Sequence, residues 1–297
     1  MDFPDKVQIK EVGPRDGLQN EKEFVTTDVK VEWINRLSSS GLKYIEITSF
    51  VPPKWIPALA DASEVAGKIT RVPGITYAAL VPNRKGLERA LEADLDEVSV
   101  FMSASEAHNR KNINKSVDET FPVLEEVVKD AVSAGKKVRG YVSTVFGCPY
   151  DGAVPVDHVK KVTDRLLNMG VYEISLGDTI GVANPWQMDQ VLKDITQSFS
   201  PDQLALHLHD TRGMALANTL VGLTHGIKVF DSAAGGLGGC PYAKGAAGNT
   251  ASEDLIHMLE EMGIDTGIDF DRFMEAAKYI EKKLEKSLPS RQLRISS

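Results

Sequence analysis

The sequence predicts an α/β fold of the (β/α)8 TIM-barrel class, with an extra helix at its C-terminal end. Strand-like runs alternate with helical patterns, which indicates a parallel sheet. Eight such runs fit within about 240 residues, and this number favours a closed barrel over a doubly wound open sheet. Because no Pro- or Ser-rich linker interrupts the pattern, we expect a single domain over residues 1–297. Its barrel should occupy about residues 7–262 and its helical cap about residues 268–288.

The expected strands are short runs rich in β-branched and aromatic residues. In chain order they read VQIKEVG (7–13), YIEITSF (44–50), TYAALV (76–81), EVSVFM (97–102), KVRGYVSTVF (137–146), YEISLG (172–177), LALHLHD (204–210) and VFDSAA (229–234). Three of the helical patterns between them, over residues 30–41, 120–135 and 156–170, each end at a glycine, which is the usual stop signal. The amphipathic stretch 270–288 should pack on the barrel as the cap.

Composition and charge exclude several classes of protein. The chain has 297 residues, 42% of them hydrophobic, and a formal net charge of −8. Such an acidic protein is unsuited to general nucleic-acid binding, which needs surplus Lys and Arg. No segment is long and apolar enough to span a membrane, and the first residues do not resemble a signal or transit peptide. With two cysteines, Cys148 and Cys240, a reducing, cytoplasmic location is expected.

Polar residues gather where the expected strands end, which is where barrel enzymes carry their active sites. They are Glu11, Arg15 and Asp16 at the first strand, Glu46 and Thr48 on the second, Asp178 after the sixth, His207, His209 and Asp210 on the seventh, and Cys240, Lys244 and Asn249 after the eighth. We therefore expect the active site at this end of the barrel.

A His-x-His pair on the seventh strand points to a metal site. His207 and His209 lie two residues apart, so in a strand they share one face, which we expect to be the barrel axis. In a closed barrel the eighth strand lies beside the first, which brings Asp16 and Asn249 close to this pair. Two imidazoles, a carboxylate and an amide oxygen suit Mg²⁺ or Mn²⁺ better than a structural zinc. The pair alone is weak evidence, because such histidines are more often structural.

Other motifs admit two interpretations each. Glu46 should face the barrel axis, where a buried carboxylate is either ion-paired or functional. Taken alone, Arg15 could be an ordinary surface charge. The glycine-rich stretch 235–249 is either a lid that brings Cys240 to the site or a flexible surface loop. The basic stretch 106–116 either meets the phosphates of a ligand or is a solvated run of charges.

Four longer stretches resemble the signatures of the 3-hydroxy-3-methylglutaryl-CoA lyase family. They are EVGPRDGLQNE (11–21), YEISLGDTIG (172–181), HLHDTRGMALANT (207–219) and GGLGGCPYAKGAAGN (235–249). The resemblance extends over about residues 7–285 and implies a pyruvate-carboxyltransferase-like TIM-barrel domain. One departure is Arg212, at a position where a tyrosine is expected in animal members.

The resemblance implies roles for most of these polar groups. Residues that match the family's metal ligands are Asp16, His207, His209 and Asn249. Residues that match its catalytic groups are Arg15, Cys240, Glu46, Asp178 and His207. Contacts to the CoA part of a substrate are expected from Arg15, Lys22, Arg110 and Lys111.

The implied reaction is cleavage of 3-hydroxy-3-methylglutaryl-CoA to acetyl-CoA and acetoacetate, a step of leucine degradation and ketone body formation. A base removes the proton of the 3-hydroxyl, the C2–C3 bond breaks, and a thioester enolate is protonated, with Mg²⁺ or Mn²⁺ assisting. Members of the family are commonly homodimers, so we expect a homodimer. The alternatives are a Claisen-condensing synthase of the isopropylmalate or homocitrate type on the same barrel, and a noncatalytic metal-binding barrel.

Overall fold

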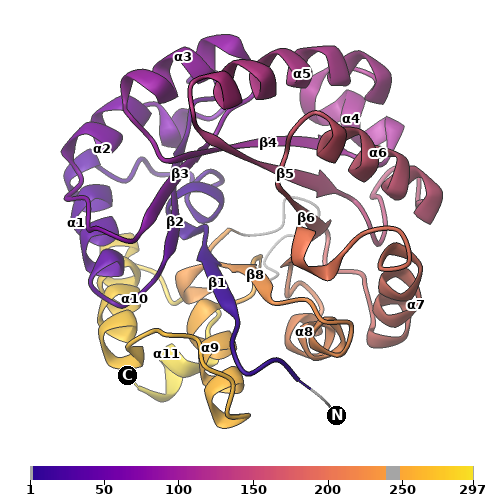
Figure 1. Cartoon of the computed structure of the whole chain (residues 1–297). Coiled ribbons are helices and arrows are strands. Elements are labelled where there is room, and N and C mark those ends of the chain that lie inside the picture. Colours follow the sequence, from indigo (N-terminus) through magenta and orange to yellow (C-terminus); the bar gives the residue numbers. More distant parts are fainter. Residues whose placement is uncertain (1–2, 239–247, 297) are drawn as a thin grey trace.

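The computed structural model shows one closed barrel of eight parallel strands, in which each strand pairs with the next in chain order and β8 pairs with β1 (Figure 1). It describes residues 3–238 and 248–296. The predicted (β/α)8 barrel is confirmed, and the doubly wound alternative is excluded. Among the helices of these two segments, none combines the length and the apolar character needed to cross a bilayer.

The strands coincide with the eight predicted runs, and most are shorter at their ends. They are β1 (Gln8–Glu11), β2 (Tyr44–Ser49), β3 (Thr76–Leu80), β4 (Glu97–Ser103), β5 (Lys137–Ser143), β6 (Glu173–Asp178), β7 (Leu204–Leu208) and β8 (Val229–Ser232). β5 stops short of its predicted end because Thr144 adopts a left-handed conformation, with φ of 63°. β8 stops early because a short 3-10 turn, Ala234–Gly236, follows it.

Helices surround the barrel and connect its strands. They are α1 (Thr27–Ser38), α2 (Ala62–Lys68), α3 (Arg84–Glu92), α4 (Glu106–Ile113), α5 (Val117–Ser133), α6 (Val156–Asn168), α7 (Pro185–Ile195), α8 (Ala215–Thr224), α9 (Ser252–Glu261), α10 (Phe270–Leu284) and α11 (Arg291–Ile295). The predicted stops at Gly41, Gly135 and Gly170 are confirmed, because all three have positive φ, of 91°, 76° and 108°. The cap helix α10 ends earlier than predicted, because Glu285 is left-handed with φ of 51°.

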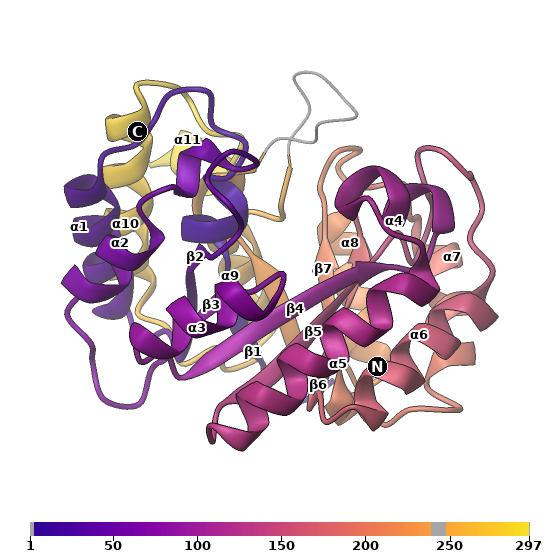
Figure 2. The same ribbon diagram turned by 90° about the horizontal axis from the view of Figure 1, so that it is seen from above.

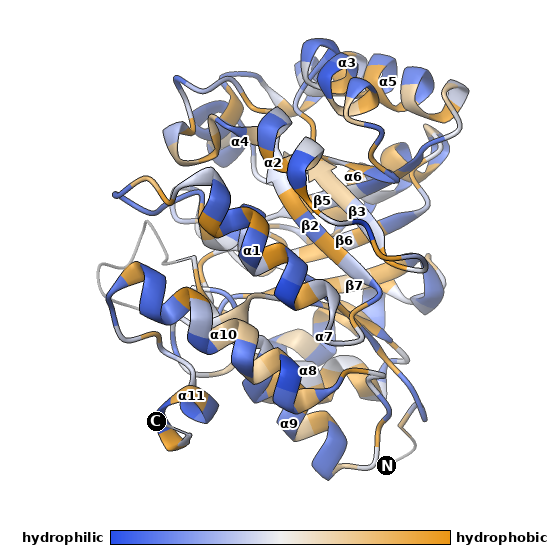
Figure 3. Ribbon diagram, turned by 90° about the vertical axis from the view of Figure 1, so that its left-hand side faces the viewer, coloured by the Kyte–Doolittle hydropathy of each residue, from blue (hydrophilic) through white to orange (hydrophobic). Residues whose placement is uncertain are grey.

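An apolar layer lies between the strands and the helices. Leu206 and Leu208 of β7 are buried in it, as the alternation of the strand predicts. α10 packs against α1, with α9 and α11 beside α10, so the C-terminal helices cover one side of the barrel (Figures 1 and 2). Figure 3 shows hydrophilic and hydrophobic residues alternating along α1 and α10, as expected for amphipathic helices with one buried face.

The interior of the barrel contains charged side chains where this fold usually has layers of branched apolar ones. Lys10, Arg139, Glu173 and Asp231 are all buried, and we call them the axial ion cluster. Lys10 Nζ lies 2.8 Å from Glu173 Oε1, and Arg139 binds Glu173 through Nε at 2.5 Å and Asp231 through Nη2 at 2.8 Å. Since β1 does not neighbour β6, nor β5 β8, two of these ion pairs cross the barrel interior.

Candidate functional site

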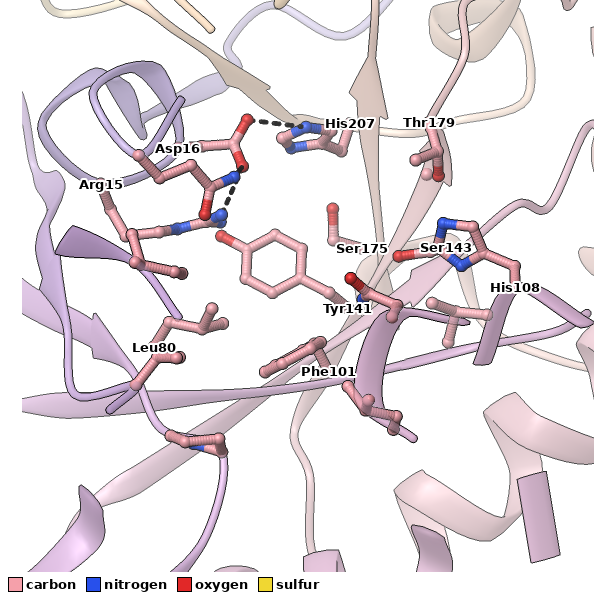
Figure 4. Close-up of a pocket in the computed structure, with 18 of the residues that line it drawn as sticks. Arg15, Asp16, Leu80, Phe101, His108, Tyr141, Ser143, Ser175, Thr179 and His207 are labelled. Carbon is pink, nitrogen blue, oxygen red and sulfur yellow. Dashed lines mark hydrogen bonds and ion pairs between the residues drawn. The ribbon is translucent and has the colours of Figure 1, made fainter. Parts of the chain in front are cut away.

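A pocket of about 490 Å³ opens at the carboxyl ends of the strands, where the sequence predicts the active site. Its wall includes Arg15, Asp16, Tyr141, His207 and His209. Figure 4 shows Asp16 facing His207, with Arg15 close to Asp16 and the ring of Tyr141 next to Arg15. Groups that lie far apart in the sequence therefore converge on one cavity.

The turn after β1 places Arg15 and Asp16 in this wall. Residues 13–17 form a short π-helical turn and are all buried. A Cβ at Gly13 would collide with Glu11 Oε1, so only glycine fits beside that carboxylate. The same oxygen accepts the N–H groups of Gly13 and Ala234, which ties the turn after β1 to the turn after β8.

Arg15 is a buried side chain that forms ion pairs with two carboxylates. Its Nε donates to Glu46 Oε2 at 2.5 Å and its Nη1 donates to Asp16 Oδ1, while the hydroxyl of Tyr141 donates to Glu46 Oε2 at 3.0 Å. Burial opposes the charge of Arg15, but Glu46 and Asp16 outweigh it and raise the pKa of the guanidinium. Arg15 is thus no surface charge. It lines the pocket, and Glu46 is buried behind it as its ion-pair partner.

Asp16, His207 and His209 form a cluster whose ligand atoms all lie within 4.8 Å of one another. His207 Nε2 is 3.4 Å from His209 Nε2 and 3.8 Å from Asp16 Oδ2. Burial opposes ionisation of Asp16, but Arg15 and the two imidazoles outweigh it and lower its pKa to about 2. Burial, together with His207, lowers the pKa of His209 to about 4. An ionised carboxylate next to a neutral imidazole is the state that a cation needs.

Asn249 completes the set that the sequence predicts. Its Nδ2 donates to Asp16 Oδ2 at 2.7 Å and to Leu237 O at 2.9 Å. Its Oδ1 is buried without a hydrogen-bond partner among the described residues, and so is Nδ1 of His209. Buried polar atoms without partners are rare in folded proteins and call for a ligand or water. The donor set and the unpartnered amide oxygen fit a divalent cation bound by oxygen and nitrogen.

Two contacts to this set were not expected from the sequence. Gln19 Nε2 donates to Asp16 Oδ1 at 2.6 Å. His207 Nδ1 lies 3.2 Å from Asp231 Oδ2. The sequence does contain a signal for Asp231. It is the one charged residue in the strand run VFDSAA, as Glu46 is in YIEITSF, and a lone charge in a buried strand needs a partner.

The side chain of Asp178 binds backbone groups of its own loop and not the Asp16–His207–His209 cluster. Its two carboxylate oxygens accept the backbone N–H groups of Val182 and Ala183, each at 3.0 Å. Burial raises its pKa, and these two hydrogen bonds partly offset the shift. Arg212 donates to two backbone carbonyls of the same loop. Asp178 therefore organises the loop after β6, and its catalytic role stays a prediction.

Of the four residues expected to contact CoA, only Arg15 is buried and lines the pocket. Lys22, Arg110 and Lys111 are exposed, and Arg110 forms an ion pair with Glu106 at 2.8 Å. None of these three basic side chains lines the pocket, whereas Lys115 of the same basic stretch does. The phosphate-binding role of this stretch stays a prediction.

The two cysteines differ in what can be said of them. Cys240 and Lys244 lie outside the described residues. Cys148 is buried, and its Sγ accepts the N–H groups of Tyr150 and Asp151, both at 3.3 Å. Cys148 is therefore a small buried side chain that supports a turn.

Comparisons with known proteins agree with the architecture. The family model described as HMGL-like matches residues 6–280. The hydroxymethylglutaryl-CoA lyase YngG of Bacillus subtilis (strain 168) is 57% identical over 295 residues, which cover 99% of this chain and 99% of that protein.

Solved structures extend the comparison to three dimensions. A crystal structure of the Bacillus subtilis HMG-CoA lyase superposes with a TM-score of 0.99 at 57% identity, covering 100% of this chain and 99% of the other. An HMG-CoA lyase from Acinetobacter baumannii, in complex with coenzyme A and 3-methylmalate, has a TM-score of 0.93 at 41% identity, covering 99% and 96%. The similarity thus includes the helical cap as well as the barrel.

Proposed function

We propose that this chain, which belongs to the HMGL-like family, is a hydroxymethylglutaryl-CoA lyase that cleaves 3-hydroxy-3-methylglutaryl-CoA to acetyl-CoA and acetoacetate. One observation carries the proposal. Asp16, His207 and His209 gather beside Arg15 in a single pocket at the carboxyl ends of the barrel strands. A solved relative with coenzyme A bound supports an acyl-CoA as the substrate.

Asp16, His207, His209 and Asn249 would hold a divalent cation, and we refer to them as the candidate metal site. When bound, Mg²⁺ or Mn²⁺ supplies Lewis acidity, which orients the hydroxyl and carboxyl oxygens of the substrate and lowers the pKa of the hydroxyl. Asp16 brings the negative charge, and Gln19 holds its second oxygen in place. The mixed oxygen and nitrogen donors favour these two ions over a structural zinc.

Arg15 acts on the other end of the scissile bond. Bond cleavage leaves negative charge on the thioester oxygen, and a guanidinium aimed at that oxygen stabilises it. Glu46 and Tyr141 hold Arg15 rigid, so little reorganisation is needed as the charge develops. Cys240, which matches the catalytic cysteine of the family, would carry a proton to or from the reacting carbon. The base that deprotonates the hydroxyl is Asp178, His207 or a water molecule.

One assay tests the function against its alternatives. The purified protein is incubated with 3-hydroxy-3-methylglutaryl-CoA and Mg²⁺, and acetoacetate is measured. A second reaction supplies acetyl-CoA and a 2-oxo acid and monitors release of free CoA, which a Claisen-condensing synthase would produce. Activity should vanish on treatment with a chelator and return with Mg²⁺ or Mn²⁺. Full activity of the metal-free protein would remove the metal from the mechanism.

The role of Cys240 has its own test. Cys240→Ser should fold normally but turn over far more slowly, because a hydroxyl is a much weaker acid than a thiol. A thiol-directed reagent should inactivate the wild type, and substrate should protect it. Cys148→Ser serves as the control, and normal turnover of Cys240→Ser would return this residue to a structural role.

The remaining expectations stay predictions. They are the homodimer, the cytoplasmic location, the place in leucine degradation and ketone body formation, and the CoA contacts of Arg15, Lys22, Arg110 and Lys111. Sedimentation of the purified protein tests the first of these directly.

A further inference from the structure

We propose that Asp231 is a positioning residue that fixes the tautomer of His207, so that the lone pair of Nε2 faces the candidate metal site. The inference rests on the proposed metal site but concerns a residue outside the ligand set. Asp231 is the member of the axial ion cluster that contacts His207, so the proposal gives this buried cluster a function at the active site.

The backbone brings the two side chains together. His207 of β7 and Asp231 of β8 are register partners in the parallel sheet, so their side chains emerge on the same side. Both are buried, and His207 Nδ1 lies 3.2 Å from Asp231 Oδ2. The other ring nitrogen, Nε2, faces Asp16 and His209. One nitrogen of the ring therefore meets the cluster and the other meets a carboxylate.

Asp231 can only accept hydrogen bonds in this environment. Its two oxygens receive the Nη1 and Nη2 groups of Arg139, at 3.1 and 2.8 Å, and the hydroxyl of Ser175, at 2.7 Å. Because its oxygens already accept from Arg139 and Ser175, this carboxylate offers Nδ1 an acceptor. The 3.2 Å contact therefore puts the proton of the ring on Nδ1 and leaves the lone pair of Nε2 free for a cation.

The second histidine shows what the contact adds. His209 Nδ1 is buried and has no partner among the described residues, so no carboxylate holds a proton on it as Asp231 does on Nδ1 of His207. His207 is the anchored ligand of the pair and His209 the adaptable one. With Nδ1 protonated and donating to Asp231, and Nε2 on the cation, His207 has no nitrogen free to accept a proton from the substrate. This assigns His207 to binding and leaves Asp178, Cys240 or water for proton transfer.

A matched pair of variants tests the inference on binding rather than on turnover. Asp231→Asn places an amide N–H group where His207, Arg139 and Ser175 now donate, which favours the wrong tautomer. Glu173→Gln alters the other carboxylate that Arg139 binds, yet no contact joins Glu173 to His207. Both variants should lower the melting temperature. Only Asp231→Asn should weaken Mn²⁺ binding, by about 10- to 100-fold, as for other outer-sphere partners of metal-bound histidines.

Mn²⁺ affinity is measured by electron paramagnetic resonance of the free ion, on the metal-free protein at one pH. Wild-type affinity in Asp231→Asn overturns the inference, and so does an equal loss in both variants, which would reflect general loosening of the cluster. If the wild type binds no Mn²⁺, the proposed metal site fails, which is a separate result.

A measurement on the wild type decides the matter if Asp231→Asn does not fold. Long-range ¹H–¹⁵N correlation spectra distinguish the two neutral imidazole tautomers, and a His207→Gln sample identifies the signal of His207. We expect the Nδ1–H tautomer in the metal-free protein. The Nε2–H tautomer overturns the inference.

Discussion

The axial ion cluster and the candidate metal site lie next to each other in one barrel, but their polar atoms are satisfied differently. Each charged group of the cluster has an ion-pair partner, as Lys10 has Glu173 and Arg139 has Asp231. In the metal site, Asn249 Oδ1 and His209 Nδ1 are buried without partners among the described residues. A fully paired network rigidifies a core, whereas unpartnered buried atoms that gather beside a pocket call for a ligand or water.

Asp231 of the axial ion cluster connects the two regions, since it pairs with Arg139 and also contacts His207 of the candidate metal site. The two regions should therefore fail in different ways when they are mutated. Damage to the cluster should appear as lost stability, and damage to the site should appear as lost turnover or lost metal. The following predictions separate the two outcomes.

The largest effect is expected from Lys10→Met, which disrupts the axial ion cluster at a residue whose ion-pair partner, Glu173, lies outside the candidate metal site. Removing one partner of a buried pair leaves an uncompensated charge, which typically costs about 3–5 kcal/mol. The melting temperature should fall strongly, while kcat of the protein that remains folded stays near the wild-type value. The exposed Lys68, which pairs with Glu64, gives the control: Lys68→Met should leave the melting temperature almost unchanged. A stable but inactive Lys10→Met would contradict the separation of the two regions.

Arg15→Gln tests the active-site pocket instead of the axial ion cluster. The enolate oxygen gains charge only as the bond breaks, so losing the guanidinium should lower kcat with a modest change in KM. The loss should be about a hundred- to a thousandfold, which corresponds to about 3–4 kcal/mol. Arg15→Lys should recover part of it, because an ammonium group cannot copy the planar fork. Arg15 is also paired with Glu46, so the same variant tests whether Arg15 serves only as a structural partner of that carboxylate. A destabilised variant with normal kcat would establish that role.

The same comparison explains which parts could be predicted from the sequence. Strand positions and the shared face of His207 and His209 follow from a period of two, and closure of the barrel brings Asp16 near them. The contact of His207 with Asp231 depends on the register of β7 against β8, which no local pattern encodes. The position of Asp178 at a strand end was predictable, but the direction of its oxygens, toward loop amides, was not. The sequence pattern therefore predicts which strand and face a residue occupies, whereas its hydrogen-bond partners depend on how the strands and loops pack in three dimensions.

A third prediction concerns a buried carboxylate that belongs to neither region. Burial raises the pKa of Glu11 to about 7, against the hydrogen bonds from Ser252, Ala234 and Gly13. A folded pKa above the unfolded value means that the folded state holds the proton between these two pH values. Stability from this group is therefore present at low pH and lost as pH rises from about 4.5 to about 7, at about 1.4 kcal/mol per pH unit.

Glu11→Gln should remove that dependence. The amide oxygen can keep both backbone N–H groups that Glu11 Oε1 accepts, and the hydroxyl of Ser252 can turn to accept from the amide nitrogen. Between pH 5 and pH 7.5 the wild type should lose stability that the variant keeps. The melting temperature of the variant relative to that of the wild type should therefore be higher at pH 7.5 than at pH 5. A constant difference between the two proteins across this range would show that Glu11 keeps an ordinary pKa.

The smallest effect is expected at the entrance of the pocket, and it compares Lys115 with Lys111. Lys115 lines the pocket, and its carbonyl oxygen accepts from Asn109 Nδ2 at 2.9 Å, so the backbone is held while the ammonium group stays exposed. Screened, exposed charge pairs contribute about 0.2–1 kcal/mol, so Lys115→Ala should raise KM for the acyl-CoA no more than about fivefold, with kcat unchanged. Lys111 is exposed but does not line the pocket, and Lys111→Ala should change KM less. Because phosphate contacts weaken with salt, the difference between the two variants should shrink at high ionic strength. A larger effect of Lys111→Ala on KM would show that the acyl-CoA binds along the exposed side of α4 and not along the pocket wall at Lys115.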